Sequence, residues 1–255
     1  MAPSIVTPPA PTDEAPPTRV AGVSLFFDFD GTLVDLAPTP DAVVVDAALL
    51  DVLARHAARA PGRVAIVSGR SIAQLDSLLG AFAGMIAVAG SHGADLRVPG
   101  VRYAPAGRPP VLDKAIAAID AFASPRGLLV ERKSHGVALH FRRTPAAAAD
   151  AITAMETIAA RTGLFLQHGK MMVELRAPGD KGRAIEALLT TPAMAGTTPL
   201  FFGDDVTDED GFAAAAAAGG AGVLVGEARG TAALYRLPNV AALHAWMATT
   251  LETAA

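Results

Sequence analysis

Two aspartates near the start of the chain are the first residues whose types and spacing could do chemistry. Asp28 and Asp30 lie in the segment LFFDFDGTLV, directly after an apolar run. Residues i and i+2 of an extended strand point to the same side, so both carboxylates could face one ligand if the strand continues that far. Two carboxylates so close repel each other and shift each other's pKa unless a cation or a shared proton lies between them. We therefore expect a cation here.

A second acidic segment, GDDVTDED, follows another apolar run and carries Asp204, Asp205 and Asp208. Oxygen ligands suit Mg²⁺, which usually binds through one or two carboxylates together with substrate phosphate and water. Acidic residues alone are weak evidence for a metal site, because Asp also makes turns and caps helices. The two segments together predict one Mg²⁺ site that draws on Asp28, Asp30, Asp204, Asp205 and Asp208.

Two further positions could hold the oxygens of a phosphate group. Ser68 follows the apolar run VAIV and precedes Gly69 and Arg70, so a hydroxyl and backbone N–H groups are available there. Lys181 opens a predicted helix, where its charge and the helix N-terminus would both attract an anion. Taken singly, Ser68 could be a helix cap and Lys181 a solvated lysine. Arg70 could cap the loop of residues 68–70, which we call the serine loop, or face the ligand. In combination with the two acidic segments, the pattern is specific.

These residues need secondary-structure elements that bring them together. Short runs that are apolar on both faces predict buried parallel strands at residues 23–27, 64–67, 86–89, 200–202 and 222–225. Helices are predicted between them at residues 42–59, 71–79, 181–189 and 208–218. This alternation predicts an α/β fold with a doubly wound, Rossmann-like parallel sheet, in which polar groups gather at the carboxyl ends of the strands. The acidic pair would lie on that edge.

Between residues 101 and 177 the pattern changes to period-two alternation, which predicts antiparallel strands with one buried and one open face. The alternating segments are 128–133, 137–142 and 164–176, with helices expected at 111–122 and 145–161. The open face would carry Glu131, Lys133, His140, Arg142, Lys170, Glu174 and Arg176. The buried face would carry Leu139, Phe141, Met171, Val173 and Leu175. We expect a smaller α+β cap domain at 101–177, inserted into a core domain of residues 21–100 and 178–255.

The polar segments also carry a family resemblance. In order, DFDGT, VSGR, GDKGRA and GDDVTDED resemble the four motifs of the haloacid dehalogenase superfamily of aspartyl phosphatases, over nearly the whole chain after residue 20. The segments ERK at 131–133, LHFRR at 139–143, GKMMVELR at 169–176 and GSHG at 90–93 resemble the trehalose-6-phosphate phosphatases. One departure is Ala177, which interrupts the Arg-Pro pair usual in that family.

The resemblance implies a Mg²⁺-dependent phosphatase. Asp28 would be the nucleophile and form an aspartyl phosphate, which divides one difficult displacement into two steps. Asp30 would protonate the departing sugar oxygen and then activate the hydrolytic water. Mg²⁺ would be held by Asp28, the backbone carbonyl of Asp30 and Asp204, with Asp205 and Asp208 as supports or further ligands.

The same resemblance assigns the remaining site residues. Thr32, Ser68 and Lys181 would bind phosphoryl oxygens, and the cap would select the substrate. Glu131 and Glu174 could accept hydrogen bonds from sugar hydroxyls, while the basic cap residues could donate to hydroxyls or phosphate. Each cap charge could equally be ordinary solvated surface. The predicted substrate-binding residues are Thr32, Gly69, Arg70, Glu131, Lys133, His140, Arg142, Lys170 and Glu174.

Three other functions fit part of the pattern. Phosphatases of sucrose phosphate or of mannosyl-3-phosphoglycerate would share the core and differ in the cap. A phosphorylated receiver module also combines carboxylates, Mg²⁺, a hydroxyl and a lysine, but its motif order differs and it would lack the charged insertion. A pure sugar-binding protein would not need Asp28 and Asp30 beside a metal.

Composition sets further limits on the protein's class. The chain of 255 residues has a formal net charge of −4 and no cysteine. This charge offers no general attraction to nucleic acid or membrane, and the lack of cysteine excludes disulfides and thiolate metal sites. No apolar stretch of about 20 residues predicts a membrane-spanning helix. We expect a cytoplasmic monomer that acts on a small phosphosugar, with residues 1–20 as a disordered, proline-rich leader.

Overall fold

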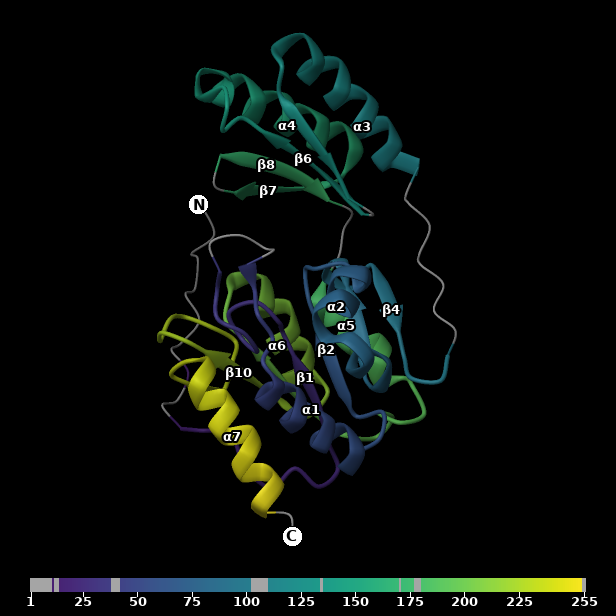
Figure 1. Ribbon diagram of the computed structural model, residues 1–255, viewed down its shortest axis with the longest axis vertical. Helices are drawn as coiled ribbons and strands as arrows, with labels where there is room; N and C mark the ends of the chain where they lie inside the picture. The colour runs from purple at the N-terminus through teal and green to yellow at the C-terminus, as the bar shows by residue number, and fades with distance from the viewer. Residues whose placement is uncertain are drawn as a thin grey trace, which may run out of the picture. The chain divides into compact units, whose positions relative to one another are not determined.

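A computed structural model describes residues 11, 14–37, 42–101, 110–133, 135–169, 171–176 and 180–253 of the chain. The chain divides into two compact units (Figure 1): a core unit, Met1–Ala104 with Asp180–Ala255, and a cap unit, Pro105–Gly179. The boundary expected at residue 101 adjoins residues 102–109, and the boundary expected at residue 177 falls within residues 177–179; both of these ranges lie outside the described residues. Those boundaries stay a prediction.

The core unit is built on a seven-stranded sheet in the order β11-β10-β9-β1-β2-β3-β4. The strands are β1 (Val23–Phe27), β2 (Val64–Val67), β3 (Ala87–Gly90), β4 (Asp95–Arg97), β9 (Thr198–Gly203), β10 (Ala221–Val225) and β11 (Tyr235–Leu237). Neighbouring strands are parallel except β4, which pairs antiparallel with β3. Strand β1 lies between β9 and β2, so the residues that follow these three strands meet at one edge of the sheet.

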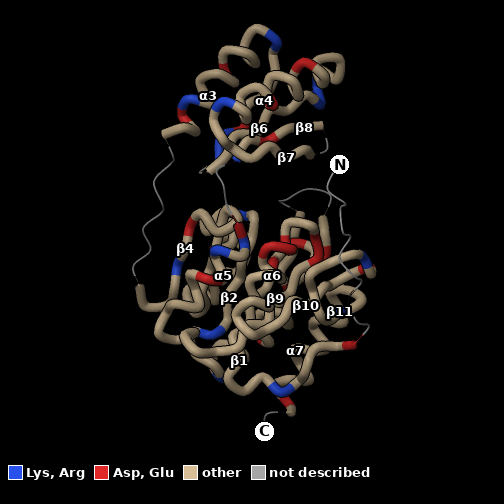
Figure 2. Tube along the Cα trace, turned by 180° about the vertical axis from the view of Figure 1, so that it is seen from behind, with Lys and Arg blue, Asp and Glu red and all other residues tan. Residues whose placement is uncertain are grey.

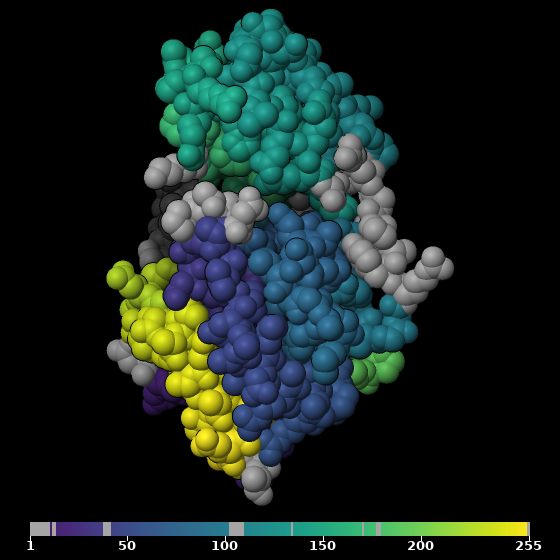
Figure 3. All heavy atoms as spheres, viewed as in Figure 1, coloured from purple at the N-terminus to yellow at the C-terminus, as the bar shows by residue number. Residues whose placement is uncertain are grey.

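Helices cover both faces of this sheet, as expected for strands that are apolar on both sides. One face packs against α1 (Ala47–Arg59), α2 (Ile72–Leu79) and α7 (Val240–Thr253), which Figure 3 shows as one continuous layer. The other face packs against α5 (Lys181–Leu189) and α6 (Glu209–Ala217). The prediction of a doubly wound α/β core is confirmed.

Some element bounds differ from the prediction. Helix α1 begins at Ala47 and not at residue 42, because the Asp46 side chain accepts a hydrogen bond from Leu49 N at 2.7 Å and caps the helix there. The short edge strands β4 and β11 were not predicted. Shorter 3₁₀ turns complete the structure: Gly80–Met85, Ser91–Gly93, Ser124–Arg126, Pro145–Ala147 and Val206–Asp208.

Part of the expected leader packs against the core unit. The indole Nε1 of Trp246 donates to the carbonyl oxygen of Pro16 at 3.0 Å, and Arg236 N donates to the carbonyl oxygen of Glu14 at 3.2 Å. Pro16 is itself buried. The prediction of a disordered segment over residues 1–20 therefore does not hold for residues 14–20, while residues 1–10, 12 and 13 lie outside the described residues.

The cap unit has a four-stranded antiparallel sheet in the order β5-β6-β8-β7. Its strands are β5 (Leu129–Arg132), β6 (Gly136–His140), β7 (Phe165–Gly169) and β8 (Met172–Arg176). Helices α3 (Pro110–Ala123) and α4 (Ala148–Thr162) pack with the side chains of Val137, Leu139, Val173 and Leu175 in one apolar cluster. The predicted α+β unit with one buried face is confirmed, but segment 164–176 forms two strands where one alternating segment was expected.

In the part of the chain that the structure describes, no helix has both the length and the apolar character needed to cross a membrane.

Candidate active site

The carboxyl ends of three neighbouring strands bring the predicted polar residues together. Asp28 follows β1, Ser68 follows β2 and Asp204 follows β9. The ladder continues one residue past the strands: Asp28 N donates to the carbonyl oxygen of Phe202 at 2.8 Å, and Ser68 N donates to that of Ala89 at 2.9 Å. The backbone that carries these side chains is therefore held in place by the sheet itself.

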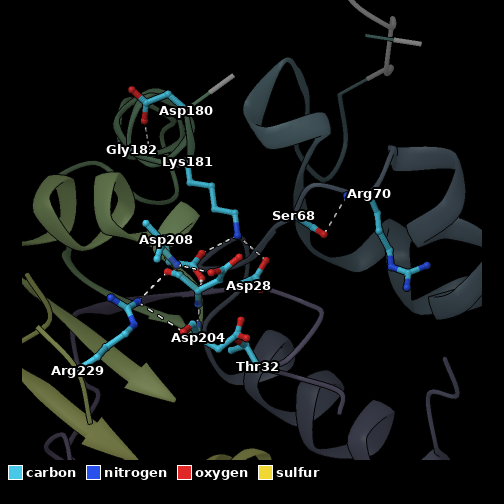
Figure 4. Close-up of polar contacts among 12 residues, drawn as sticks. Asp28, Thr32, Ser68, Arg70, Asp180, Lys181, Gly182, Asp204, Asp208 and Arg229 are labelled. Atoms are coloured by element: carbon cyan, nitrogen blue, oxygen red, sulfur yellow. Dashed lines mark hydrogen bonds and ion pairs between the residues drawn. The ribbon is translucent and has the colours of Figure 1, made fainter. Parts of the chain in front are cut away.

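Lys181 links two of the acidic residues. Its Nζ donates to Asp28 Oδ1 at 2.7 Å and to Asp208 Oδ1 at 2.6 Å, and all three side chains are buried (Figure 4). Lys181 is the first residue of α5, and the Asp180 side chain caps this helix by accepting hydrogen bonds from Gly182 N at 2.7 Å and Arg183 N at 3.2 Å. The start of the helix thus fixes the lysine beside Asp28.

Burial and mutual repulsion shift the pKa values of this group. Burial raises the pKa of Asp28 to about 7, although Lys181 opposes the shift, and the charge of Asp208 raises it further. Burial and the charge of Asp208 raise the pKa of Asp204 to about 6. Burial alone would lower the pKa of Lys181, but Asp28 and Asp208 outweigh it and raise that pKa above its usual value. One lysine does not neutralise three carboxylates, so the group favours a further cation or a proton.

The acidic loop between β9 and α6 is held by its own side chains. Asp208 Oδ2 accepts hydrogen bonds from Asp204 N at 3.0 Å and Asp205 N at 2.9 Å. The Asp205 carboxylate is exposed and accepts from Val206 N at 2.6 Å, at the start of the 3₁₀ turn. Figure 2 shows acidic residues gathered where β9 runs into α6.

Among the described residues, Asp28, Asp204 and Asp208 each offer a carboxylate oxygen within 4.8 Å of the others. An all-oxygen donor set in which two carboxylates have raised pKa values fits a hard divalent cation such as Mg²⁺. Because both oxygens of Asp208 already accept hydrogen bonds from the chain, Asp28 and Asp204 are the better placed to bind the ion. The structure does not bring the predicted ligand Asp205 into this group.

Gly31 is the point at which the two acidic segments touch. Its φ of +85° lies in the left-handed region, and a Cβ on this residue would lie 2.1 Å from Asp204 Oδ2. The next residue, Thr32, is buried and donates from Oγ1 to Asp204 Oδ1 at 3.3 Å. Thr32, which we expected to bind a phosphoryl oxygen, therefore contacts the acidic loop in this structure.

Asp30 lies apart from the acidic group. Strand β1 ends at Phe27, so the i, i+2 geometry that would turn Asp28 and Asp30 to the same side does not continue to residue 30. Arg70 Nε and Nη2 donate to the two carboxylate oxygens of Asp30, each at 2.7 Å, and the guanidinium lies 5.6 Å from the centre of the Phe29 ring. In this structure the Asp30 carboxylate therefore pairs with Arg70 and does not join the group formed by Asp28, Asp204 and Asp208; the expectation that it faces the cation stays a prediction.

The serine loop is supported by the GSHG segment. The buried Ser68 accepts a hydrogen bond from Arg70 N at 3.1 Å, and its carbonyl oxygen accepts one from His92 N at 2.9 Å. Ser91 and His92 have φ values of 52° and 56°, which are strained for residues with a side chain. The His92 ring lies against Gly69, where an added Cβ would come within 2.7 Å of it.

Comparison with known proteins identifies the family to which the chain belongs. The model of the family described as Trehalose-phosphatase matches residues 26–240. The chain belongs to the trehalose-phosphatase family. Its members are phosphatases, so the protein is a phosphoric monoester hydrolase. The resemblance noted in the sequence is confirmed.

Known proteins of this family and fold support the assignment. The chain is 35% identical to the trehalose-6-phosphate phosphatase of Escherichia coli, over 91% of this chain and 87% of the relative. The solved trehalose-6-phosphate phosphatase of Aspergillus fumigatus has a TM-score of 0.63 and 26% identity, over 90% of this chain and 92% of that one. A sugar phosphatase of HAD subclass IIB shares the fold, with a TM-score of 0.58 and 18% identity over 90% and 98% of the two chains.

The cap of this trehalose-phosphatase family member carries charged side chains on the open face of its sheet. His140 Nε2 lies 2.9 Å from Glu131 Oε2, and Lys133 Nζ donates to Glu174 Oε2 at 2.5 Å. Arg142 follows β6 in an exposed turn, and the predicted residue Lys170 lies outside the described residues. Four of the predicted cap residues thus form two close polar pairs on one face, of which Lys133 and Glu174 form an ion pair.

One arginine near the site was not found from the sequence of this family member. Arg229, between β10 and β11, donates from Nη2 to the carbonyl oxygen of Asp205 at 2.8 Å. A single arginine in a loop belongs to no motif, and its partners on the acidic loop are backbone atoms distant in the chain. The sequence therefore carries no signal for this contact.

Proposed function

We propose that this protein hydrolyses trehalose 6-phosphate to trehalose and inorganic phosphate, with Asp28 as the nucleophile and Mg²⁺ as the cofactor. The observation that carries the proposal is the buried contact of Lys181 with Asp28 and Asp208 beside Asp204, in a chain of the trehalose-phosphatase family. A relative with 35% identity is named for the same substrate.

Hydrolysis would take place in two displacements at phosphorus. A carboxylate oxygen of Asp28 attacks the phosphorus atom, the bond from phosphorus to the sugar oxygen breaks, and Asp30 gives its proton to that oxygen. Water then attacks the aspartyl phosphate, Asp30 takes a proton from the water, and the bond between Asp28 and phosphorus breaks. Phosphate leaves and Asp28 is restored.

Asp30 must change partners to carry these protons. In this structure both of its oxygens accept hydrogen bonds from Arg70. Figure 4 shows the Arg70 side chain directed away from Lys181. We propose that binding of the phosphosugar draws Asp30 out of this pair, so that a protonated carboxyl can reach the leaving oxygen.

The charged groups around Asp28 would hold the phosphoryl group. Lys181 and the Ser68 hydroxyl supply donors for the phosphoryl oxygens, with Gly69 N–H beside them. Asp28, Asp204 and the backbone carbonyl of Asp30 would bind Mg²⁺, which when bound cancels repulsion among the carboxylates and stabilises the charge of the transferring group. Asp208 would orient Lys181 and the loop that carries Asp204.

The open face of the cap would recognise the sugar. Glu131 and Glu174 would accept hydrogen bonds from sugar hydroxyls, and the basic cap residues would donate to hydroxyls or phosphate. These donors are Lys133, His140, Arg142 and Lys170. We also propose a monomeric, cytoplasmic protein, which light scattering of the purified protein and fractionation of the source cells would test.

Phosphate release from a small set of phosphosugars tests this function. Purified protein is incubated with trehalose 6-phosphate, sucrose 6-phosphate and mannosyl-3-phosphoglycerate, each with Mg²⁺ or with a chelator. Release that is fastest from trehalose 6-phosphate and that requires Mg²⁺ supports the proposal. Preference for another substrate would replace the substrate assignment, stoichiometric phosphorylation without turnover would indicate a receiver, and binding alone would indicate a sugar-binding protein.

A further inference from the structure

The acidic loop has a second set of contacts on the side away from Lys181. Arg229 Nη2 donates to the carbonyl oxygen of Asp205 at 2.8 Å and lies 3.5 Å from that of Asp204. Figure 4 shows Arg229 and Lys181 reaching this loop from different elements. The Arg229 side chain is 27% exposed, so its charge is partly shielded from water.

Glu209 fixes the direction of this arginine. Glu209 is the first residue of α6, and its carboxylate forms an ion pair with Arg229 Nη1. The same carboxylate accepts hydrogen bonds from the buried Thr231 Oγ1 at 2.8 Å and from Ala232 N at 2.7 Å. With three donors around it, Glu209 has little freedom to move. The guanidinium is therefore held in one orientation by Glu209, which is itself bound by Thr231 and Ala232.

The backbone of Asp204 and Asp205 is consequently fixed on both sides. Their N–H groups donate to Asp208 Oδ2, and their carbonyl groups face Arg229. The Asp204 side chain itself has only the long contact with Thr32 Oγ1, at 3.3 Å, among the hydrogen bonds that the structure describes for its carboxylate. The position of that carboxylate thus depends mainly on the loop backbone.

We infer that Arg229 is a positioning residue for the cation site. It holds the Asp204–Asp205 backbone so that the Asp204 carboxylate lies beside Asp28, in position to bind the cation. The inference rests on the proposed Mg²⁺-dependent function and extends it to a residue outside the four motifs. Residues that orient metal ligands in this way typically change metal affinity or activity about 10- to 100-fold when they are replaced.

Mg²⁺ affinity is the measurement that separates positioning from simple structural support. Mg²⁺ is titrated calorimetrically into the substrate-free wild-type protein and into Arg229→Gln, and thermal unfolding of each is measured without Mg²⁺. We expect Mg²⁺ binding to weaken about tenfold or more in Arg229→Gln. We also expect kcat to recover at high Mg²⁺, with the KM for the phosphosugar changed less than about twofold, because the cap is untouched.

Four further variants, one of them a matched control, complete the design. Arg229→Lys keeps the charge but loses the planar fork, so it should weaken Mg²⁺ binding less than Arg229→Gln does. Glu209→Gln should weaken it in the same direction, and the double variant should lose little more than Arg229→Gln alone, because the two residues act as one unit. The matched control is Arg63→Gln: Arg63 also donates to a backbone carbonyl, that of Ala193 at 3.1 Å, but it directly precedes β2 and so lies at the opposite end of that strand from Ser68. Its Mg²⁺ affinity should equal that of the wild type.

Two results would overturn the inference, and they differ in what they imply for the function. Unchanged Mg²⁺ affinity in Arg229→Gln, together with a clear loss in Asp204→Asn, would remove the role of Arg229 and leave the proposed cation site intact. Unchanged affinity in both variants would remove the cation site as well. Should Arg229→Gln not fold, wild-type Mg²⁺ affinity in both Arg229→Lys and Glu209→Gln would equally refute the positioning role.

Discussion

The acidic group of the core and the charged face of the cap contain similar side chains that differ in their exposure to solvent. In the core, Lys181, Asp28 and Asp208 are buried, with side chains no more than 7% exposed. In the cap, the side chains of Lys133 and Glu131 are 40% and 49% exposed, although Lys133 forms an ion pair with Glu174 and Glu131 lies 2.9 Å from His140 Nε2. Breaking a buried pair leaves an uncompensated charge, whereas an exposed pair contributes little and is easily exchanged. The contacts of the cap should therefore be exchanged for other partners more easily than those of the core, as the proposed recognition of sugar hydroxyls requires.

The largest effect should come from removing the nucleophile. Asp28→Asn should lower kcat at least about 10⁴-fold, because an amide cannot attack phosphorus as a carboxylate does. The fold should persist, since the amide oxygen can still accept from Lys181. Phosphate release and a melting curve measure both effects. The control is Asp51→Asn, which alters a carboxylate on α1 that is 68% exposed and should change neither. Substantial remaining activity in Asp28→Asn would reject the nucleophile assignment.

Replacing a cap carboxylate should discriminate between substrates. Glu174→Ala should lower kcat/KM for trehalose 6-phosphate about 10- to 100-fold, the usual effect of losing a hydrogen bond to a charged group. Hydrolysis of a small aryl phosphate should change less than about threefold, because that substrate has no sugar to recognise. The control is Arg132→Ala on β5, whose charge pairs with Asp120 of α3. Equal losses on both substrates would argue against a specificity role for the cap.

Replacing a glycine in the serine loop should lower activity on both substrates alike. Gly69→Ala places a methyl group within 2.7 Å of the His92 ring and should displace the loop that carries Ser68. We expect kcat/KM to fall about tenfold for both the disaccharide phosphate and the aryl phosphate, because each must bind its phosphoryl group there. Gly84→Ala is the control, since its added Cβ would meet nothing within 4 Å. A loss confined to the sugar substrate would contradict this division of roles.

The smallest expected effect is the dependence of the free energy of unfolding on pH in the metal-free protein. In the unfolded chain the pKa of an aspartate is near 3.8, whereas in the folded core the pKa of Asp28 is raised to about 7 and that of Asp204 to about 6. Between these values the folded state binds more protons than the unfolded state, so the free energy of unfolding should fall as pH rises from about 4 to 7. Mg²⁺ should reduce the fall, because the ion favours the ionised carboxylates.

Melting temperatures at pH 5, 6, 7 and 8, with and without Mg²⁺, measure this dependence. The double variant Asp28→Asn/Asp204→Asn should lose most of it. The cap variant Glu131→Gln/Glu174→Gln should keep it. A cap variant that flattened the pH dependence would overturn the contrast between the two regions.

The sequence predicted the elements that are apolar and short, and missed features that depend on contacts through space. Strands β1 and β2 and helix α5 have the expected bounds, because each apolar run or capping residue marks its own end. The turn between β7 and β8 was missed because apolar and polar residues alternate on both sides of it and only the phase of the alternation changes. The register pairs Gln167 with Glu174, so the open face changes from odd to even residue numbers at this turn.

The same distinction holds for the site. Asp28, Lys181 and Asp204 could be found because each follows a strand or opens a helix in a motif of its own. The pairing of Asp30 with Arg70 could not, because it depends on where β1 ends and on how the serine loop turns. The contact of Arg229 with the acidic loop joins residues 24 positions apart through a backbone atom, and no side-chain pattern records it.

Trp246 allows the unfolding of the core unit to be followed separately from that of the cap unit. It is the only tryptophan in the chain, and it lies in α7 with its ring 4.8 Å from that of Phe202 and its indole bonded to Pro16. Fluorescence excited at the indole band therefore reports on the core unit, including residues 14–20 that pack against it, and does not report on the cap. Circular dichroism sees the helices of both units, so a cap that melts on its own would show as two denaturation curves that do not superimpose.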